Sequence, residues 1–190
     1  MAGLGRSVRV GAAVLAGWLI TGLLGCSASG SGTDRIVAAG PSTPSGVAVA
    51  PERPGRAEGL TLAAAEEFVR YYSDLLNYAS ATGDTARLLG ESDTGCENCK
   101  SYADFVKKSN AANGLLTGDY REKVGDVAEL VRGVHGRVGG SATIQVGRYV
   151  SRQTATASPF TSEATKYNRK FALSARGQRW VMFEMQLVEQ

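Results

Sequence analysis

Histidine is nearly absent from this sequence of 190 residues, in which His135 is the single example. The sequence contains no recognisable Ser-His-Asp arrangement, phosphate-binding loop or dinucleotide fingerprint, which argues against hydrolases and nucleotide-dependent enzymes. Cysteine is scarce too, with three residues. Two thiols and His135 would offer zinc three ligands where a structural site needs four, so we expect no metal and no cofactor.

An excess of charge of one sign is also missing. The chain has 21 Lys and Arg residues against 18 Asp and Glu residues, and 19 basic residues remain without Arg6 and Arg9. A nucleic-acid-binding protein would show a basic stripe with stacking aromatic residues. Only Lys107-Lys108 stands out as a basic cluster here. The composition therefore predicts no nucleic-acid partner.

The N-terminal segment has the layout of a secretory signal. Arg6 and Arg9 precede a 15-residue apolar run over residues 10–24, and Cys26 introduces a small, polar stretch. A helix needs about 20 apolar residues to cross a membrane, so this run is short for a span. We interpret residues 1–25 as a signal peptide, with an uncleaved N-terminal anchor as the alternative.

The sequence LLGC at positions 23–26 resembles the lipobox of bacterial lipoproteins. In such proteins the cysteine thiol takes a diacylglycerol group and becomes the new N-terminus. The resemblance implies that Cys26 is lipidated and that palmitate-type chains anchor the protein to the cell membrane, facing the extracytoplasmic side. Two or three acyl chains keep a protein at a bilayer, whereas a protein with a single chain dissociates readily.

Residues 27–59 have low complexity, with four of the five prolines and no aromatic residue. Such a segment cannot bury enough apolar surface to offset the backbone entropy that folding removes. We therefore predict that residues 26–59 form a disordered tether that begins at the lipidated cysteine. Residues 60–190 would then form one domain, a length that suits a single core.

The first half of this domain has the spacing of helices. Thr61 is placed to cap a first helix, and Gly83 can end it in a left-handed turn. A short second helix is expected after Asp84. A third is expected to begin near Cys96 and to run towards Gly114.

The second half alternates with a period of two, which predicts strands over residues 126–134, 141–151, 166–175 and 179–189. A three-residue loop at 175–177 would pair Phe171 with Val181 and keep the odd-numbered apolar residues on one face. Trp180 and Met182 would then point to the other face. Helices followed by a four-stranded antiparallel meander predict an α+β fold, in which the helices pack on a curved sheet.

Two segments carry a resemblance to the nuclear-transport-factor-2-like, or cystatin-like, cone: the aromatic first helix FVRYYSDLLNYASATGD and the last strand GQRWVMFEMQLV. With the lipobox, the tether and the GCENC motif, they resemble an uncharacterised family of actinobacterial lipoproteins. The resemblance covers residues 60–190 and implies a fold and a location, but no activity. It makes Tyr72, Phe105, Phe171 and Phe183 candidates for lining the pocket of the cone.

Cys96 and Cys99 form an even pair once Cys26 is assigned to lipidation. In an oxidising compartment we expect a local disulfide at the start of the third helix. The alternative is a redox-active CxxC pair, because a helix N-terminus lowers the pKa of a thiol. A thioredoxin-like site also needs a preceding buried strand and a facing cis-proline, and Pro159 is the one proline of the domain.

We expect a membrane-anchored lipoprotein that binds a small apolar ligand or an envelope protein without catalysis. The alternative is an isomerase or dehydratase that uses the cavity of the cone, which would need an acid or histidine in an apolar pocket. A lining of apolar atoms would favour binding, whereas a buried acid beside a tyrosine or histidine would favour catalysis. The oligomeric state stays open.

We predict that the substitution Cys26→Ser releases the protein from the membrane, because it removes the thiol that takes the lipid. Membrane and soluble fractions of cells that express either form provide the measurement. If the variant remains with the membranes as the original chain does, the lipoprotein interpretation fails.

Overall fold

The computed structural model describes residues 48–189, so the predicted signal peptide and Cys26 lie outside the described residues. The helices are α1 (Leu62–Thr82), α2 (Ala86–Gly90) and α3 (Glu97–Lys108), preceded by a 3-10 helix over Gly55–Ala57. Among these residues, no helix combines the length and the apolar character that crossing a bilayer requires.

The helix boundaries follow from local capping. Thr61 accepts a hydrogen bond from the backbone N–H of Ala64 at 3.0 Å, and Gly83 ends α1 with φ of 78°, as predicted. The third helix is shorter than expected, since α3 ends before Ser109. There the Asn110 side chain donates to the Val106 carbonyl at 2.7 Å and satisfies a carbonyl that a longer helix would have used.

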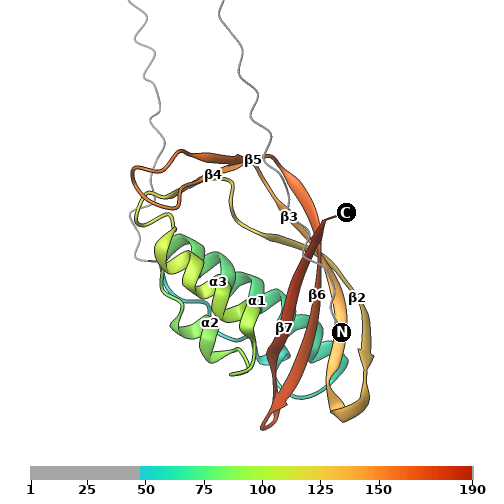
Figure 1. The fold of residues 1–190 in the computed structure, drawn as a ribbon. Coiled ribbons are helices and arrows are strands. Elements are labelled where there is room, and N and C mark those ends of the chain that lie inside the picture. Colours follow the sequence, from blue (N-terminus) through green and yellow to red (C-terminus); the bar gives the residue numbers. More distant parts are fainter. Residues whose placement is uncertain (1–47, 190) are drawn as a thin grey trace, which may run out of the picture. The chain divides into compact units, whose positions relative to one another are not determined.

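The described strands form two antiparallel sheets. The larger has the order β2-β3-β6-β7, with bounds Lys123–Arg132, Val138–Val146, Thr165–Arg176 and Arg179–Glu189. The smaller has the order β1-β4-β5, with bounds Leu116–Gly118, Tyr149–Ser151 and Phe160–Ser162. Figure 1 shows α1 and α3 on one side of the larger sheet, and β4 and β5 at one end of it. The α+β class with a four-stranded antiparallel sheet is therefore confirmed.

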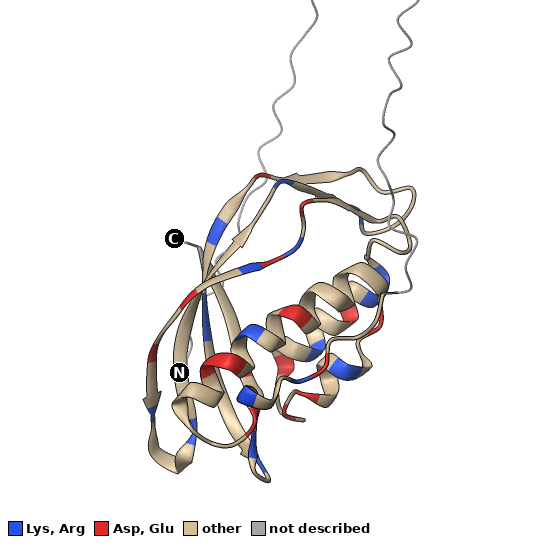
Figure 2. Ribbon diagram, turned by 180° about the vertical axis from the view of Figure 1, so that it is seen from behind, with Lys and Arg blue, Asp and Glu red and all other residues tan. Residues whose placement is uncertain are grey.

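The core lies between the helices and the larger sheet. Helix α1 contributes Phe68, Tyr72, Leu75 and Leu76, all fully buried, because these residues recur along one face of the helix. Basic and acidic residues are interleaved along the outer side of the helices (Figure 2). The amphipathic pattern of α1 thus positions the helix on the sheet.

The strand predicted over residues 141–151 is in fact two strands that belong to different sheets. The chain leaves β3 at Gly147, where an added Cβ would collide with the Asp119 side chain. Asp119 also donates its backbone N–H to the carbonyl of Arg148 at 3.0 Å. A glycine is needed at this close approach, and the change of direction lets β4 join the smaller sheet.

The hairpin between β6 and β7 also differs from the prediction. Arg176 pairs with Arg179 around a two-residue turn at Gly177-Gln178, and Gly177 has φ of 62°. Phe171 pairs with Met185 rather than with Val181. A two-residue turn with glycine first matches the twist of the two strands, which explains why it replaces the longer loop.

A bulge at Phe183 then changes which residues of β7 face the helices. Glu184 pairs with Ala172 and Met182 pairs with Leu173, so Phe183 is an extra residue without a partner on β6. The extra residue reverses the alternation along the strand. As a result, Trp180, Met182 and Met185 all belong to the core, although their numbers differ in parity.

The prediction of a disordered tether up to residue 59 is wrong at its C-terminal end. Residues 48–59 pack on the domain, and Ala57 in the 3-10 helix is fully buried. Composition suggested disorder because the segment is rich in proline and small residues. A single side chain, that of Arg53, provides much of its attachment.

Arg53 is held by charge, hydrogen bonds and aromatic contact. Its Nη2 donates to Glu91 Oε2 at 2.5 Å and to the Trp180 carbonyl at 2.9 Å. The guanidinium lies 4.7 Å from the centre of the Phe68 ring. Because the side chains of Arg53 and Glu91 are 6% and 11% exposed, removing Arg53 would leave the charge of Glu91 buried without its partner.

We predict that Arg53→Ala lowers the free energy of unfolding by about 3 kcal/mol, since it strands the buried carboxylate of Glu91. Arg56→Ala is the matched control: Arg56 pairs with Glu67 at 2.8 Å but is 76% exposed, so its loss should cost less than about 1 kcal/mol. Urea unfolding followed by circular dichroism measures both. Equal losses would show that Arg53 does not anchor the segment.

Candidate functional site

A cavity of about 120 Å³ lies where α3 faces the end of the larger sheet and the smaller sheet. A second hollow of about 420 Å³ adjoins it, and both are lined by Tyr102, Phe105 and Leu187. Phe105 and Leu187 are 47% and 50% exposed, so apolar side chains lie at the surface beside the hollows. The walls are therefore largely apolar and aromatic.

A buried ion pair provides the charged part of this site. Arg169 of β6 lines the larger hollow and Glu122, just before β2, lines the smaller one. Arg169 Nη2 donates to Glu122 Oε1 at 2.5 Å, and the two side chains are 3% and 10% exposed. The pair is thus removed from solvent, where a charge without a partner is costly.

Helix α1 positions both members of the pair. Ser73 Oγ accepts from Arg169 Nη1 at 2.9 Å. One turn further along, the amide side chain of Asn77 donates to the Glu122 carbonyl at 2.9 Å and accepts from its N–H at 2.7 Å. Residues four apart share a helix face, so Ser73 and Asn77 bring the arginine and the glutamate together.

Two atoms of the pair remain without a hydrogen-bond partner among residues 48–189. They are Arg169 Nε and Glu122 Oε2, and both are buried. Buried polar atoms in proteins are as a rule hydrogen bonded. Arg53 Nε and Tyr71 Oη are buried without a partner in the same way, so open atoms alone do not distinguish this pair as a binding site.

Tyr102 of α3 adds a hydroxyl group to the cavity wall. Its oxygen is 2.6 Å from Ser80 Oγ. Burial raises the pKa of Tyr102 above its ordinary value, and the nearby charge of Glu122 raises it further. The phenol therefore stays protonated at neutral pH and serves as a hydrogen-bonding group.

Of the four residues predicted to line the pocket, one lies at the two hollows and three lie elsewhere. Phe105 lines both hollows. Tyr72 lies in the core, where its hydroxyl is 2.8 Å from Ser92 Oγ and burial raises its pKa to about 12. Phe171 also packs in the core. The bulge turns Phe183 away from the core face. The guanidinium of Arg137 lies over the Phe183 ring, 3.6 Å from the ring centre.

Arg169 and Glu122 were not among the residues predicted for the site. One signal was present for the arginine, since Arg169 occupies an odd position between Tyr167 and Phe171 on the face predicted to be apolar. A charged residue at such a position is a sign of a buried polar contact. No comparable pattern marks Glu122, which lies outside the strand that its neighbours form.

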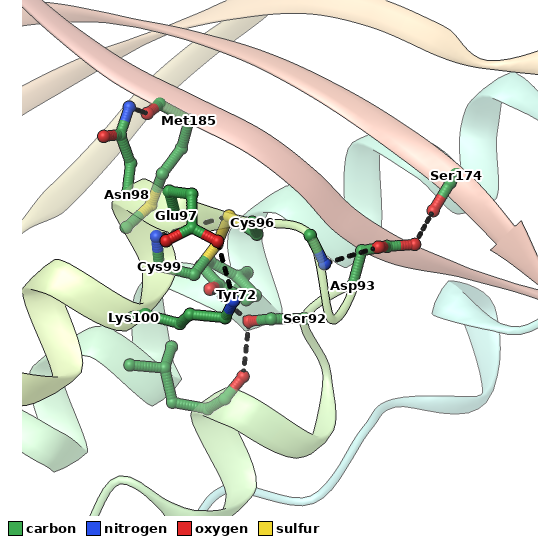
Figure 3. Close-up of a disulfide and its surroundings, with 12 residues drawn as sticks. Tyr72, Ser92, Asp93, Cys96, Glu97, Asn98, Cys99, Lys100, Ser174 and Met185 are labelled. Carbon is green, nitrogen blue, oxygen red and sulfur yellow. Dashed lines mark hydrogen bonds and ion pairs between the residues drawn. A yellow bond between two sulfur atoms is a disulfide. The ribbon is translucent and has the colours of Figure 1, made fainter.

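The predicted disulfide between Cys96 and Cys99 is confirmed. Cys96 caps α3, its sulfur accepting the N–H of Cys99 at 3.2 Å, and the two residues are 1% and 0% exposed. Figure 3 shows Asn98 reaching the Met185 carbonyl, at 2.7 Å, and Asp93 reaching Ser174, at 3.0 Å. The disulfide thus braces the contact between α3 and β7.

Asp93 strengthens the same turn. Its carboxylate accepts the N–H of Gly95 at 2.9 Å, and this hydrogen bond holds the pKa of Asp93 below its ordinary value. Both thiols of the pair are used in the disulfide, so neither is free to bind a metal ion, and His135 lies in an exposed turn. The burial of both sulfurs likewise gives no support to the redox alternative.

The described domain is thus an α+β domain with an apolar cavity beside a buried ion pair. A family model described as "Family of unknown function (DUF6318)" matches residues 41–186, and the chain belongs to this family. The matched range begins before the predicted domain boundary, in agreement with the packed segment at residues 48–59. No curated protein matches the chain.

Two solved structures are similar in shape. One is described as "Crystal structure of intermembrane space region of chloroplast protein ARC6", with 15% identity and a TM-score of 0.49, covering 68% of this chain and 98% of that one. The other, whose name begins Rd1NTF2_05, has 10% identity and a TM-score of 0.38. The match covers 64% of this chain and 97% of that one. Similarity at this level identifies no activity.

We predict that dithiothreitol leaves the Cys96–Cys99 disulfide intact in the folded chain, because both sulfurs are shielded from solvent. Labelling with a thiol reagent after the treatment should detect no thiol from this pair. The same treatment in urea should release both thiols and provides the control. Rapid labelling of the folded chain would contradict the structural role and favour the redox alternative.

Proposed function

We propose that this chain is a membrane-anchored extracytoplasmic lipoprotein whose domain binds a small apolar ligand without catalysis. The anchor is supported by the LLGC sequence at positions 23–26 and by the apolar run before it. The helices on one side of an antiparallel sheet support the cone-like fold that the sequence suggested. Binding of an envelope protein at the same surface is the alternative partner.

The observation that carries the proposal is the apolar opening. The larger hollow, at about 420 Å³, lies within the range of roughly 300–1,000 Å³ that small-molecule sites occupy. Phe105 and Leu187 present about half of their surfaces to solvent at this place. Covering such side chains with an apolar ligand removes their surface from water, which favours binding.

A second candidate function, an isomerase or dehydratase, is favoured by one observation. Glu122 is a buried acid in the same cavity wall as Tyr102. Against catalysis, one carboxylate oxygen already accepts from Arg169, and the Tyr102 hydroxyl is hydrogen bonded to Ser80. Groups committed in this way suit the recognition of a ligand better than the movement of a proton.

We predict that the chain binds the fluorescent apolar probe N-phenyl-1-naphthylamine saturably, and that Phe105→Asp weakens this binding at least about tenfold. The chain carries Cys26→Ser in this experiment, so that no attached lipid competes for the probe. Phe160→Asp is the control, because Phe160 is 67% exposed in β5 and does not line either hollow. Absence of saturable binding, or equal losses in both variants, would contradict the proposal.

A further inference from the structure

Tyrosine side chains are concentrated around the smaller hollow. The chain has seven tyrosines, and four of them line this hollow, each from a different part of the fold. They are Tyr102 of α3, Tyr120 between β1 and β2, Tyr149 of β4 and Tyr167 of β6. All four are half-buried, so each keeps part of its surface accessible. The tertiary structure thus surrounds the hollow with aromatic rings that lie far apart in the sequence.

Within the described residues, none of these four rings stacks on another ring or carries an arginine side chain. The aromatic pairs in contact among residues 48–189 are Phe68 with Tyr71 and Phe68 with Tyr72. The rings that arginine side chains cover in the same part of the chain lie elsewhere, and they are Phe68, Tyr71, Trp180 and Phe183. The faces of the four tyrosines at the hollow are therefore left for another partner.

The charged side chain among those that line the smaller hollow is an acid. Glu122 lines this hollow, whereas Arg169 lines the larger one. Burial is the main reason that the pKa of Tyr102 is raised, and the charge of Glu122 raises it further by more than Arg169 lowers it. Aromatic ring faces are negative as well. The rings and the carboxylate together make the smaller hollow favourable for a cation.

We infer that the smaller hollow binds the quaternary ammonium head group of an otherwise apolar ligand. Such a head group has no N–H and needs no hydrogen-bond acceptor, and its charge is attracted by the faces of aromatic rings. Clusters of aromatic side chains are a recurrent means by which proteins recognise these cations. This inference rests on the proposed function, and it adds the chemical class of the ligand, a long-chain quaternary ammonium compound.

The sizes of the two hollows suit a ligand with a head group and a chain. The smaller, at about 120 Å³, is below the range of roughly 300–1,000 Å³ that whole small-molecule ligands occupy, so it suits a head group alone. The larger, at about 420 Å³, adjoins it and shares Phe105 and Leu187 with it. A hydrocarbon chain in contact with these two side chains and with Met185 would extend from the head group towards solvent.

Other head groups fit the smaller hollow less well. A primary ammonium group is strongly hydrated and carries three N–H donors, each of which needs an acceptor once water is removed. A carboxylate would be repelled by Glu122 and by the negative faces of the rings. A neutral hydroxyl group gains nothing from the attraction between rings and a positive charge. The quaternary ammonium group combines a positive charge with an apolar surface.

The test is competition for the site by ligands that differ in the head group. With N-phenyl-1-naphthylamine bound to the full chain carrying Cys26→Ser, octyltrimethylammonium, octylammonium, 1-octanol and octanoate are compared below the concentrations at which they form micelles. We expect octyltrimethylammonium to displace the probe at a concentration at least about tenfold lower than each of the others. Equal displacement by octyltrimethylammonium and either octylammonium or 1-octanol would overturn the inference and leave the proposed apolar binding intact.

Paired variants connect the preference to the tyrosine rings. Tyr120→Leu combined with Tyr149→Leu removes two rings, and it should lower the preference for octyltrimethylammonium over octylammonium at least about threefold. Tyr120→Phe combined with Tyr149→Phe keeps both rings and should keep the preference. Tyr78→Leu is the matched control, since Tyr78 is also half-buried but lines neither hollow. An unchanged preference in a folded chain with both leucines would overturn the inference.

The comparison of head groups in the chain with all four tyrosines needs no further variant, so it remains decisive even where the double leucine variant fails to fold. Circular dichroism identifies that case. If N-phenyl-1-naphthylamine itself shows no saturable binding, the proposed function fails, and the inference that rests on it fails too.

Discussion

The guanidinium group of Arg169 connects the parts of the domain on which the candidate site depends. From the middle of β6 it reaches Ser73 on α1 and Glu122 before β2, and Asn77 holds Glu122 in place from the same helix. Placing two charges in the interior costs solvation free energy that their attraction barely recovers, and apolar side chains of similar size are often as stabilising. Because α1 holds both members of the pair, the loss of either side chain would leave the other charge buried without its partner.

A second buried pair, between Arg53 and Glu91, has a different role. Its hydrogen bonds run to the backbone of Ala57 and Trp180, and the guanidinium stacks on Phe68. Here the charge serves attachment, because it fastens residues 48–59 to the edge of the sheet at β7. The disulfide of the GCENC motif supports the same edge further along. The Arg53–Glu91 pair and the disulfide thus both stabilise contacts to β7, the edge strand of the larger sheet.

Much of the fold could be predicted from the sequence, because capping and periodicity act over short distances. Thr61 and Gly83 bound α1 as expected, and the period of two identified the strands of the larger sheet. Register could not be predicted, since it depends on which residues of two strands meet. The bulge at Phe183 illustrates this: alternation along one strand does not reveal an extra residue, and that residue decided that Trp180 and Met182 face the core.

By itself, the sequence determined the helices and strands and their α+β class, and it located the cysteine pair, because each of these depends on residues close together in the chain. Only the tertiary structure decided the cavity. Arg169 and Glu122 are 47 positions apart, and Ser73 lies a further stretch away on the first helix. Their meeting is set by the packing of α1 on the sheet, where the exclusion of water strengthens the attraction between the two charges.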